Sequence, residues 1–424
     1  MSLAKNKLLI LGGTRLSTEI IQKAQSMGIF VLVSDYLENS PGKRIADESF
    51  MVSTRDVEGL VDLIINEKVD GVLTGFIDSL LPYYQKVCEI TGLPCYGTKE
   101  QFDILPNKAK FKKLCRDFKI PVVEEFSIDY PLSHAQVDAL PFPVLVKPVD
   151  YSGARGVYVC ENNENFMSNY EKSLSFSPSR TLLIEKYIYS KEIHIHYLIQ
   201  NGQFSLAAVA DRHMSTNNVG DLRLPVAYTY PSKYIHVYEK NLNNKVIEML
   251  QSIGIQNGII LLQGFVENEN ITLYEIAFRL NGTLEYKIIN EICGVNPLER
   301  LINFALTGSM YQENINDLID ADYNKYGFSL AFSVKPGKIG KISGLQEIEE
   351  LDGIIDIVSF YDEGDEVPES ASGTLSQIIF RISGTADTEE AMRSRMNMII
   401  NLINVESFSG ESMLVYVFDT TNLY

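Results

Sequence analysis

A lysine at the end of an apolar stretch, followed by a glycine-containing turn, is where this sequence most clearly offers chemistry. The segment covers residues 146–157, and Lys147 follows its apolar start. Its turn holds Ser152, Gly153, Arg155 and Gly156. Glycines let backbone N–H groups point at an anion, and lysine and arginine supply the positive charge that phosphoryl oxygens require. The segment predicts a phosphate site, with a ligand-free glycine-rich hairpin as the alternative.

A second group of polar residues interrupts two strongly apolar stretches within 258–279. If the polar turn between them centres on Glu269, Gln263 stands opposite Glu275, with Cβ atoms about 5 Å apart. Alternation along a strand then puts Arg279 on the same face as Glu275. Carboxylate and amide oxygens suit Mg²⁺, with Mn²⁺ as a possible substitute. The pattern predicts a metal site at Gln263 and Glu275, and a plain Glu275–Arg279 salt bridge is the alternative.

Two further features could help to hold a nucleotide. Lys108 falls in the first turn of a helix that Asn107 can cap, where a cation opposes the helix dipole, so its position indicates an anion nearby. Glu185 closes an apolar stretch and Glu192 follows it, and such carboxylates can accept hydrogen bonds from an adenine amino group or from ribose hydroxyls. A surface lysine and a solvated acidic face are the alternatives.

The first hundred residues alternate short apolar stretches with amphipathic ones, which predicts a parallel α/β layer. Strands are expected at 8–11, 30–33 and 71–74. Gly12, Gly13 and Asp35 end the first two, as in dinucleotide-binding folds, but the full glycine motif is absent and a structural tight turn is favoured.

The middle of the chain has strand-like stretches and one long polar segment. Strands are expected at 144–146, 156–160, 181–184 and 193–200. Residues 212–232 are expected to form a loop over an active site, with Arg223 and His213 as candidates for carboxylate recognition, or else a disordered excursion. From about residue 325 the chain is mainly β-like, with a helix expected at 388–402 between strands at 377–382 and 413–418.

Bulk properties narrow the functional class. A chain of 424 residues that is 45% hydrophobic and 22% charged can form about three domains. The net charge of −18 argues against nucleic acid and anionic membrane partners, and no apolar run reaches the length of a bilayer span, so a cytoplasmic protein is expected. The five scattered cysteines indicate buried thiols.

Taken together, these residues resemble the ATP-grasp superfamily, and most closely its carbamoyl-phosphate-synthetase-like and L-amino-acid-ligase-like branch. The resemblance covers about residues 5–310 and is specific as a set. It implies an α/β and α+β fold, with a Rossmann-like pre-ATP-grasp domain at 1–103, an ATP-grasp domain at 104–324 and a small C-terminal α+β domain at 325–424.

The resemblance also implies a role for each site residue. ATP phosphates would be bound by Lys108, Lys147 and the loop containing Ser152, Gly153, Arg155 and Gly156. Adenine would be held by Glu185 and the backbone of Lys186 and Ile188, and ribose by Glu192. Mg²⁺ would be ligated by Gln263 and Glu275, and Arg279 would stabilise the acyl phosphate and the later oxyanion, with Lys147 as its catalytic companion.

The implied activity is that of a carboxylate–amine ligase that joins small-molecule acids and amines through an acyl phosphate, and a homodimer is compatible with the family. One departure stands out, because Ala277 occupies the position where the family usually has an asparagine ligand for the second metal. Two alternatives therefore stay open: an ATP-binding regulatory or scaffold protein with a degenerate site, and a carboxylase-like enzyme.

Overall fold

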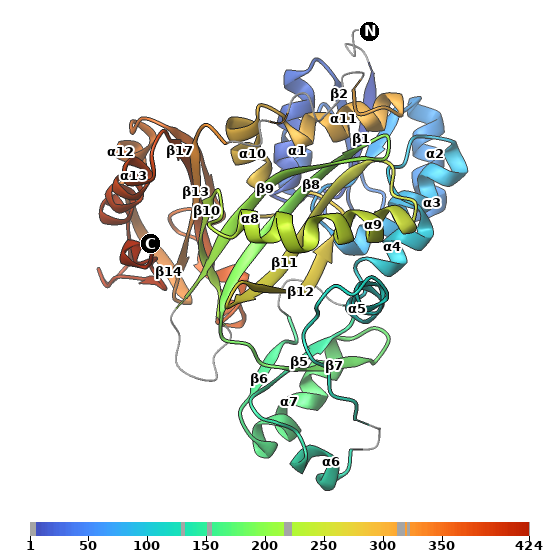
Figure 1. Ribbon diagram of the computed structural model, residues 1–424. Helices are drawn as coiled ribbons and strands as arrows, with labels where there is room; N and C mark the ends of the chain where they lie inside the picture. Colours follow the sequence, from blue (N-terminus) through green and yellow to red (C-terminus); the bar gives the residue numbers. More distant parts are fainter. Residues whose placement is uncertain are drawn as a thin grey trace.

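The computed structural model describes residues 6–128, 132–150, 155–215, 223–311, 319 and 323–423. The N-terminal part is a four-stranded parallel sheet in the order β3-β2-β1-β4, with helices on its faces (Figure 1). Its elements are β1 (Lys7–Leu11), α1 (Ser17–Ser26), β2 (Phe30–Ser34), η1 (Pro41–Arg44), β3 (Glu48–Phe50), α2 (Val57–Glu67), β4 (Gly71–Leu73), η2 (Asp78–Leu80), α3 (Leu81–Thr91) and α4 (Lys99–Ile104). The predicted parallel α/β layer is confirmed.

In the turn after β1, backbone N–H groups are already bound by a side chain of the protein. Asp35 accepts hydrogen bonds from the N–H groups of Gly13, at 2.7 Å, and Leu37, at 2.8 Å. A Cβ atom on Gly13 would lie 2.2 Å from the hydroxyl of Ser40, so the chain packs tightly against this glycine. These contacts favour the structural tight turn over a dinucleotide site, as the sequence indicated.

The centre of the molecule is a large antiparallel sheet in the order β12-β11-β8-β9-β10-β13-β17-β15, with β19 paired to β13 (Figure 1). Its strands are β8 (Lys191–Gln200), β9 (Gln203–Met214), β10 (Pro225–Tyr230), β11 (Gly258–Glu267), β12 (Asn270–Ala277), β13 (Tyr326–Val334), β15 (Ile354–Ser359), β17 (Ile378–Ala386) and β19 (Leu414–Val415). The accompanying helices are α8 (Ile235–Tyr238), the π-helix η3 (Glu239–Asn243), α9 (Asn244–Ser252), α10 (Glu285–Cys293) and α11 (Pro297–Thr307). One continuous apolar core joins this sheet to the N-terminal layer.

A small separate lobe projects from one edge of the large sheet, at the bottom of Figure 1. It has its own apolar core and a three-stranded sheet in the order β6-β5-β7. Its elements are β5 (Val144–Pro148), β6 (Tyr158–Cys160), β7 (Leu182–Lys186), α6 (His134–Asp138) and α7 (Asn163–Phe176). Helix α5 (Lys108–Asp117) lies between this lobe and β12, and its N-terminus is capped as predicted, since Asn107 accepts from the N–H of Lys110 at 3.1 Å.

The C-terminal segment shares the large sheet and adds a second, smaller one. Strands β13, β15 and β17 continue the large sheet beyond β10, and β16-β14-β18 form a three-stranded sheet beside it. The remaining elements are β14 (Gly337–Ser343), α12 (Leu345–Glu349), β16 (Glu366–Val367), η5 (Glu369–Ala371), η6 (Leu375–Gln377), α13 (Glu389–Leu402), β18 (Asn404–Ser407) and η7 (Thr420–Asn422). The predicted helix at 388–402 is present, whereas the domain boundaries at 103/104 and 324/325 stay predictions.

The expected long loop at 212–232 is largely wrong. Residues up to Met214 belong to β9, and Pro225–Tyr230 form β10, which pairs with β9. Arg212 and Tyr228 face one another across these strands, so their polar side chains lie on a sheet surface and not in a loop. The sequence suggests a loop because Pro225 and Pro231 bracket β10, and β10 shows no alternation since all its residues are buried. Residues 216–222 lie outside the described residues.

Candidate functional site

A buried ion network joins helix α5 to the small lobe. Lys112, whose side chain has 0% exposure, forms an ion pair with Glu185 and donates to the carbonyl of Val123 at 3.0 Å. Lys147 Nζ lies 2.7 Å from the other oxygen of Glu185, and Glu125 Oε1 is 3.4 Å from Lys112 Nζ. Burial opposes ionisation of Glu185, but Lys147 and Lys112 outweigh it and lower its pKa. Glu125 also pairs with Arg116, so three cations face two carboxylates here and leave positive charge available for an anion.

The predicted metal pair is assembled next to this network. Gln263 and Glu275 are directly opposed on β11 and β12, and Glu275 Oε1 lies 3.7 Å from Lys108 Nζ. The side chain of Glu275 is 37% exposed, whereas that of Lys108 is only 8% exposed. The carboxylate is therefore open to a ligand, with a cation held beside it.

The register of this hairpin was predicted correctly for an incomplete reason. The turn is formed by Asn268 and Glu269, which both have positive φ, and Glu267 pairs with Asn270. That register alone would not bring Gln263 opposite Glu275. An irregularity between Gln263 and Gly264 adds one residue on β12, and this bulge restores the opposition.

Helix α5 links the two clusters. Lys108 and Lys112 lie one turn apart on its buried face, so one reaches Glu275 on the large sheet and the other reaches Glu185 in the small lobe. The N–H of Lys108 also donates to the carbonyl of Val149 at 3.1 Å, which ties the helix to the chain that follows Lys147. Three buried lysines therefore gather between the two sheets, although the protein as a whole is acidic.

Glu192 lies on the large sheet among cations. It forms an ion pair with Arg212, accepts from the hydroxyl of Tyr274 at 2.9 Å, and lies 3.6 Å from Arg223 Nη2. Arg212 also donates to Tyr274 at 2.8 Å. Both arginines of the expected substrate-recognition segment are therefore engaged with the residue predicted to bind ribose.

The remaining adenine-side residues follow Glu185 along the chain. Lys186 ends β7 with an exposed side chain, and its N–H donates to the carbonyl of Glu124 at 3.0 Å. Ile188 is half-buried in the segment between β7 and β8. The roles of these residues stay predictions.

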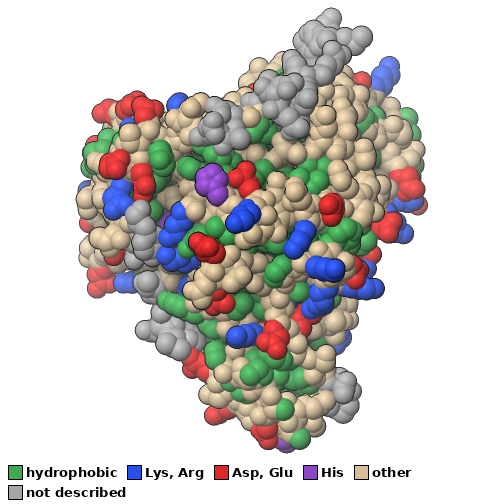
Figure 2. All heavy atoms as spheres, viewed as in Figure 1, with side chains coloured by type: hydrophobic (Ala, Val, Ile, Leu, Met, Phe, Trp, Pro, Cys, Tyr) green, Lys and Arg blue, Asp and Glu red, His purple; other side chains and the backbone are tan. Residues whose placement is uncertain are grey.

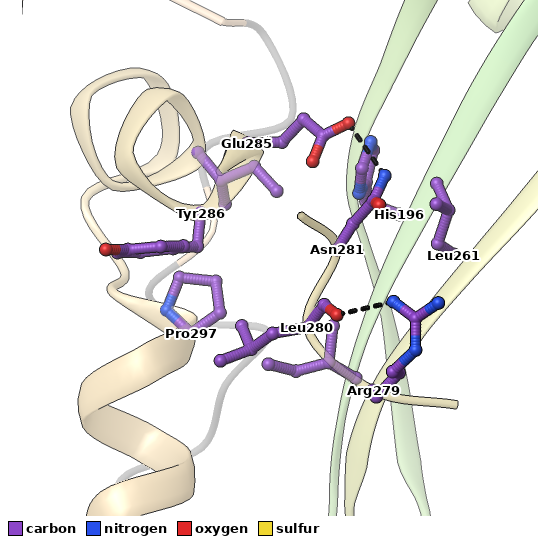
Figure 3. A pocket seen from close by; sticks show the side chains of 10 residues that line it. His196, Leu261, Arg279, Leu280, Asn281, Glu285, Tyr286 and Pro297 are labelled. Atoms are coloured by element: carbon purple, nitrogen blue, oxygen red, sulfur yellow. Dashed lines mark hydrogen bonds between the residues drawn. The ribbon is translucent and has the colours of Figure 1, made fainter. Parts of the chain in front are cut away.

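Arg279 is fixed by a partner from the N-terminal layer. Its Nε donates to Asp78 Oδ1 at 2.7 Å, Nη2 forms the second contact with Asp78, and Nη1 donates to the carbonyl of Leu280 at 2.8 Å. Burial opposes the charge of Arg279, but Asp78 outweighs it and raises the arginine pKa. Arg279 lines a small pocket with His196, Leu280 and other residues (Figure 3). A two-bond contact of this kind orients the guanidinium group.

The phosphate loop is only partly within the described residues. Ser152 and Gly153 lie outside them, while Arg155 is exposed. Gly156 has a φ of +74°, and its carbonyl accepts from the hydroxyl of Ser173 at 2.7 Å. A Cβ atom at Gly156 would lie 2.8 Å from that of Phe176, so the expectation of a glycine-specific turn holds at this position.

Two residues of the site were missed from the sequence. Lys112 could have been found from its spacing, since it follows Lys108 by four residues on the apolar side of one helix. Asp78 carries no such signal, because it is far from Arg279 in the sequence and belongs to another layer of the fold.

The donor set fits a magnesium ion and a polyphosphate. A carboxylate and an amide from adjacent strands suit Mg²⁺, which completes its octahedron with water and phosphate oxygens. Ala277, opposite Leu261 on β11, offers no further oxygen from its side chain. The lysines of α5 and β5 can neutralise phosphate charge.

Comparison with known proteins identifies a matching domain family and several relatives. Residues 140–285 match the model of a family described as "ATP-grasp domain". The chain is 23% identical over 292 residues to a formate-dependent phosphoribosylglycinamide formyltransferase of Prochlorococcus marinus, covering 66% of this chain and 71% of that one. It is 22% identical over 262 residues to a carbamoyl phosphate synthase large chain of Clostridium acetobutylicum, covering 61% of this chain but only 24% of that protein.

Solved structures show the same fold. An L-amino acid ligase from Bacillus licheniformis aligns with a TM-score of 0.75 at 17% identity, covering 95% of this chain and 99% of that one. The biotin carboxylase domain of the Hydrogenobacter thermophilus 2-oxoglutarate carboxylase, solved with MgADP and bicarbonate, aligns with a TM-score of 0.75 at 17% identity, covering 96% and 91%. The chain therefore has the ATP-grasp fold, and its residues 140–285 match an ATP-grasp domain, as the sequence predicted.

Proposed function

We propose that this protein is an ATP-dependent carboxylate–amine ligase that forms an amide or peptide bond and releases ADP and phosphate. The observation that carries the proposal is the convergence around α5, where Lys108 meets Glu275, which stands opposite Gln263, while Lys112 and Lys147 meet Glu185. Structures with the same fold include a phosphoribosylglycinamide synthetase and an L-amino acid ligase, in agreement with such an activity.

The proposed reaction has two steps. An oxygen of the acid attacks the γ-phosphorus of ATP and ADP leaves, and then the amine nitrogen attacks the acyl carbon and phosphate leaves. Lys108 and Lys147 neutralise the phosphates, and Arg279, oriented by Asp78, stabilises the oxyanion. Bound at Gln263 and Glu275, Mg²⁺ would supply charge neutralisation for the transferring phosphoryl group.

The proposal covers the substrates and the oligomeric state only as broad classes. Small molecules are expected, and no helix in the described part of the chain has the length and apolarity needed to cross a bilayer. On the face shown in Figure 2, acidic and basic side chains are interspersed and form no extended basic field of the kind that nucleic acid would need. A homodimer is compatible with this proposal.

A trapping experiment tests the proposal. The protein is incubated with Mg-ATP, pools of carboxylic acids and hydroxylamine, and both phosphate and hydroxamate are measured. Hydroxylamine intercepts an acyl phosphate, so a particular acid should yield the two products in equal amounts. Replacing hydroxylamine with pools of amines should give new amide masses.

Matched variants control the trapping experiment. Lys147→Met should abolish both products, whereas Lys172→Met, which removes an exposed lysine on α7, should not. Phosphate release without hydroxamate from any acid would refute the ligase.

One observation favours a second candidate, a nucleotide-binding protein without turnover. Ala277 supplies no oxygen at the position where a second metal ligand is expected. Saturable ATP binding with no acid-stimulated phosphate release would support this candidate, and release stimulated by bicarbonate alone would indicate a carboxylase-like enzyme.

A further inference from the structure

Two histidines alternate along β8 on the polar face of the large sheet. His194 and His196 are two residues apart, so both side chains leave the strand on the same side. Helix α10 packs over this face against β9, β13 and β17, and its first residue is Glu285. Figure 3 shows Glu285 from α10 and His196 from the sheet facing one another.

The three side chains can offer one ligand atom each within a small volume. These atoms all lie within 4.8 Å of one another, and all three residues are buried. His194 Nδ1 lies 3.3 Å from Glu285 Oε1. Within the described ranges of the chain, no other group of three or more His, Cys, Asp or Glu side chains meets these criteria.

Several atoms of this cluster are buried without a hydrogen-bond partner among the described residues. They are Nε2 of His194, Nε2 of His196 and Oε2 of Glu285. A buried polar atom left without a partner costs about 1–3 kcal/mol, so three of them together indicate a missing ligand. Imidazole nitrogens that lack a partner are free to ligate a metal in their neutral form.

The surroundings complete a metal site. Asn281 Nδ2 donates to Glu285 Oε1 at 3.0 Å, and such outer contacts orient a metal-ligating carboxylate. The pocket beside His196 and Glu285 has a volume of about 20 Å³, which is enough for one water or one ligand atom at an open coordination position.

We propose that His194, His196 and Glu285 bind a divalent transition-metal ion of the zinc class, in addition to any magnesium at Gln263 and Glu275. Two imidazole nitrogens and one carboxylate suit Zn²⁺, Co²⁺ or Fe²⁺, whereas the amide and carboxylate oxygens of the other pair suit Mg²⁺. Gln263 pairs with His194 across β11 and β8, so the new ion would lie one strand away from the magnesium pair.

The competing occupant is the ammonium group of an amine substrate. Glu285 would attract it, and burial of this carboxylate demands a positive charge. Two neutral imidazoles converging on the same carboxylate favour a metal, because nitrogen donors ligate borderline metal ions well. Arg212 pairs with Glu192 and Arg279 pairs with Asp78, whereas the buried Arg381 of β17 supplies one positive charge close to Glu285.

Metal titration of the purified protein tests the proposal, and the site does not depend on ligase activity. The protein is stripped with a chelator and titrated with Co²⁺ and with Zn²⁺ in the presence of millimolar Mg²⁺, without ATP. One equivalent of Co²⁺ should bind with visible absorption bands typical of a low-coordinate site, and Zn²⁺ should displace it. Millimolar Mg²⁺ should not displace the bound Co²⁺.

Variants assign the ligands. His196→Gln and Glu285→Gln should lose the tight equivalent, and Asn281→Ala should weaken it by about 10–100-fold. His236→Gln is the matched control, because this histidine side chain is 92% exposed and should leave binding unchanged. Circular dichroism checks that each variant is folded.

Several results would overturn the proposal. Absence of a tight equivalent in the unmodified protein decides against it even if the variants fail to fold. Equal binding by Glu285→Gln, or displacement of Co²⁺ by Mg²⁺, also decides against it. Thermal stabilisation by small amines that requires Glu285, without metal binding, would assign the cluster to an ammonium group.

Discussion

Loss of the buried lysine Lys112 should destabilise the protein strongly. In Lys112→Met a side chain of similar length loses its charge, which leaves Glu185 with Lys147 as its cation and the Val123 carbonyl without its 3.0 Å donor. Removing one partner of a buried ion pair costs about 3–5 kcal/mol when the other charge is left unpaired. Because Lys147 Nζ stays 2.7 Å from Glu185, we expect the lower end, about 3 kcal/mol of unfolding free energy.

The loss should also depend on pH in a definite direction. Burial opposes ionisation of Glu185, but Lys147 and Lys112 hold its pKa below the ordinary value. A depressed pKa contributes stability above the unfolded-state pKa of about 4.3, and this stability is lost as pH falls through the folded-state pKa. Without Lys112 the pKa of Glu185 rises and the contribution shrinks. The destabilisation should therefore be larger at about pH 7 than at about pH 4.

Urea denaturation at both pH values measures this effect. Lys113→Met is the matched control, since Lys113 is the next residue on the same helix and is exposed. Its stability should stay within about 0.5 kcal/mol of the unmodified protein. The reasoning is refuted if the two variants are equally stable, or if the loss at Lys112 grows toward low pH.

Three further predictions concern the site and its support. Arg279→Lys keeps the charge but breaks the two-bond contact with Asp78, so kcat/KM for acid-stimulated phosphate release should fall by about 10²–10³-fold; an unchanged value would contradict the role of Arg279. Ala277→Asn should lower the Mg²⁺ concentration that gives half-maximal turnover, and unchanged or weaker activation by metal would count against a missing ligand. Gly71→Ala places a Cβ atom 2.4 Å from the carbonyl oxygen of Ala305, so it should destabilise the protein by about 1–3 kcal/mol in thermal or urea unfolding. A stability equal to that of the unmodified protein would mean that β4 and α11 do not pack as described.

Local patterns predicted the parts of the fold that depend on local chemistry. The apolar stretches of β1, β2 and β4 and the Asn107 cap of α5 follow from periodicity and capping alone. The opposition of Gln263 and Glu275 was also predicted, although a bulge compensates for a turn placed one residue away from the assumed one. Nothing in the sequence indicates this bulge, so the predicted pairing of Gln263 with Glu275 is correct only because the bulge offsets the error in the assumed turn.

The residues and strands that the sequence did not predict depend on contacts between distant parts of the chain. Lys112 appears as one lysine among several on α5, and only the fold buries it against Glu185. Asp78 is an ordinary acidic residue until the N-terminal layer brings it to Arg279. Residues 212–214 and 225–230 lie in strands that the sequence did not predict, because Pro225 and Pro231 suggest a loop. In addition, β10 is buried along its whole length and so lacks the alternation that marks half-exposed strands.

Binding of Mg-ATP is the most direct test of the central claim that the lysines of α5 and β5, together with Glu275, form a nucleotide site. Calorimetric titration at millimolar Mg²⁺ should give one saturable site for a non-hydrolysable ATP analogue. Lys108→Met should weaken it strongly, and Glu275→Gln should remove most of its dependence on Mg²⁺. The account would be contradicted if the folded protein bound no adenine nucleotide. It would also be contradicted if both variants bound the analogue as tightly as the unmodified protein does.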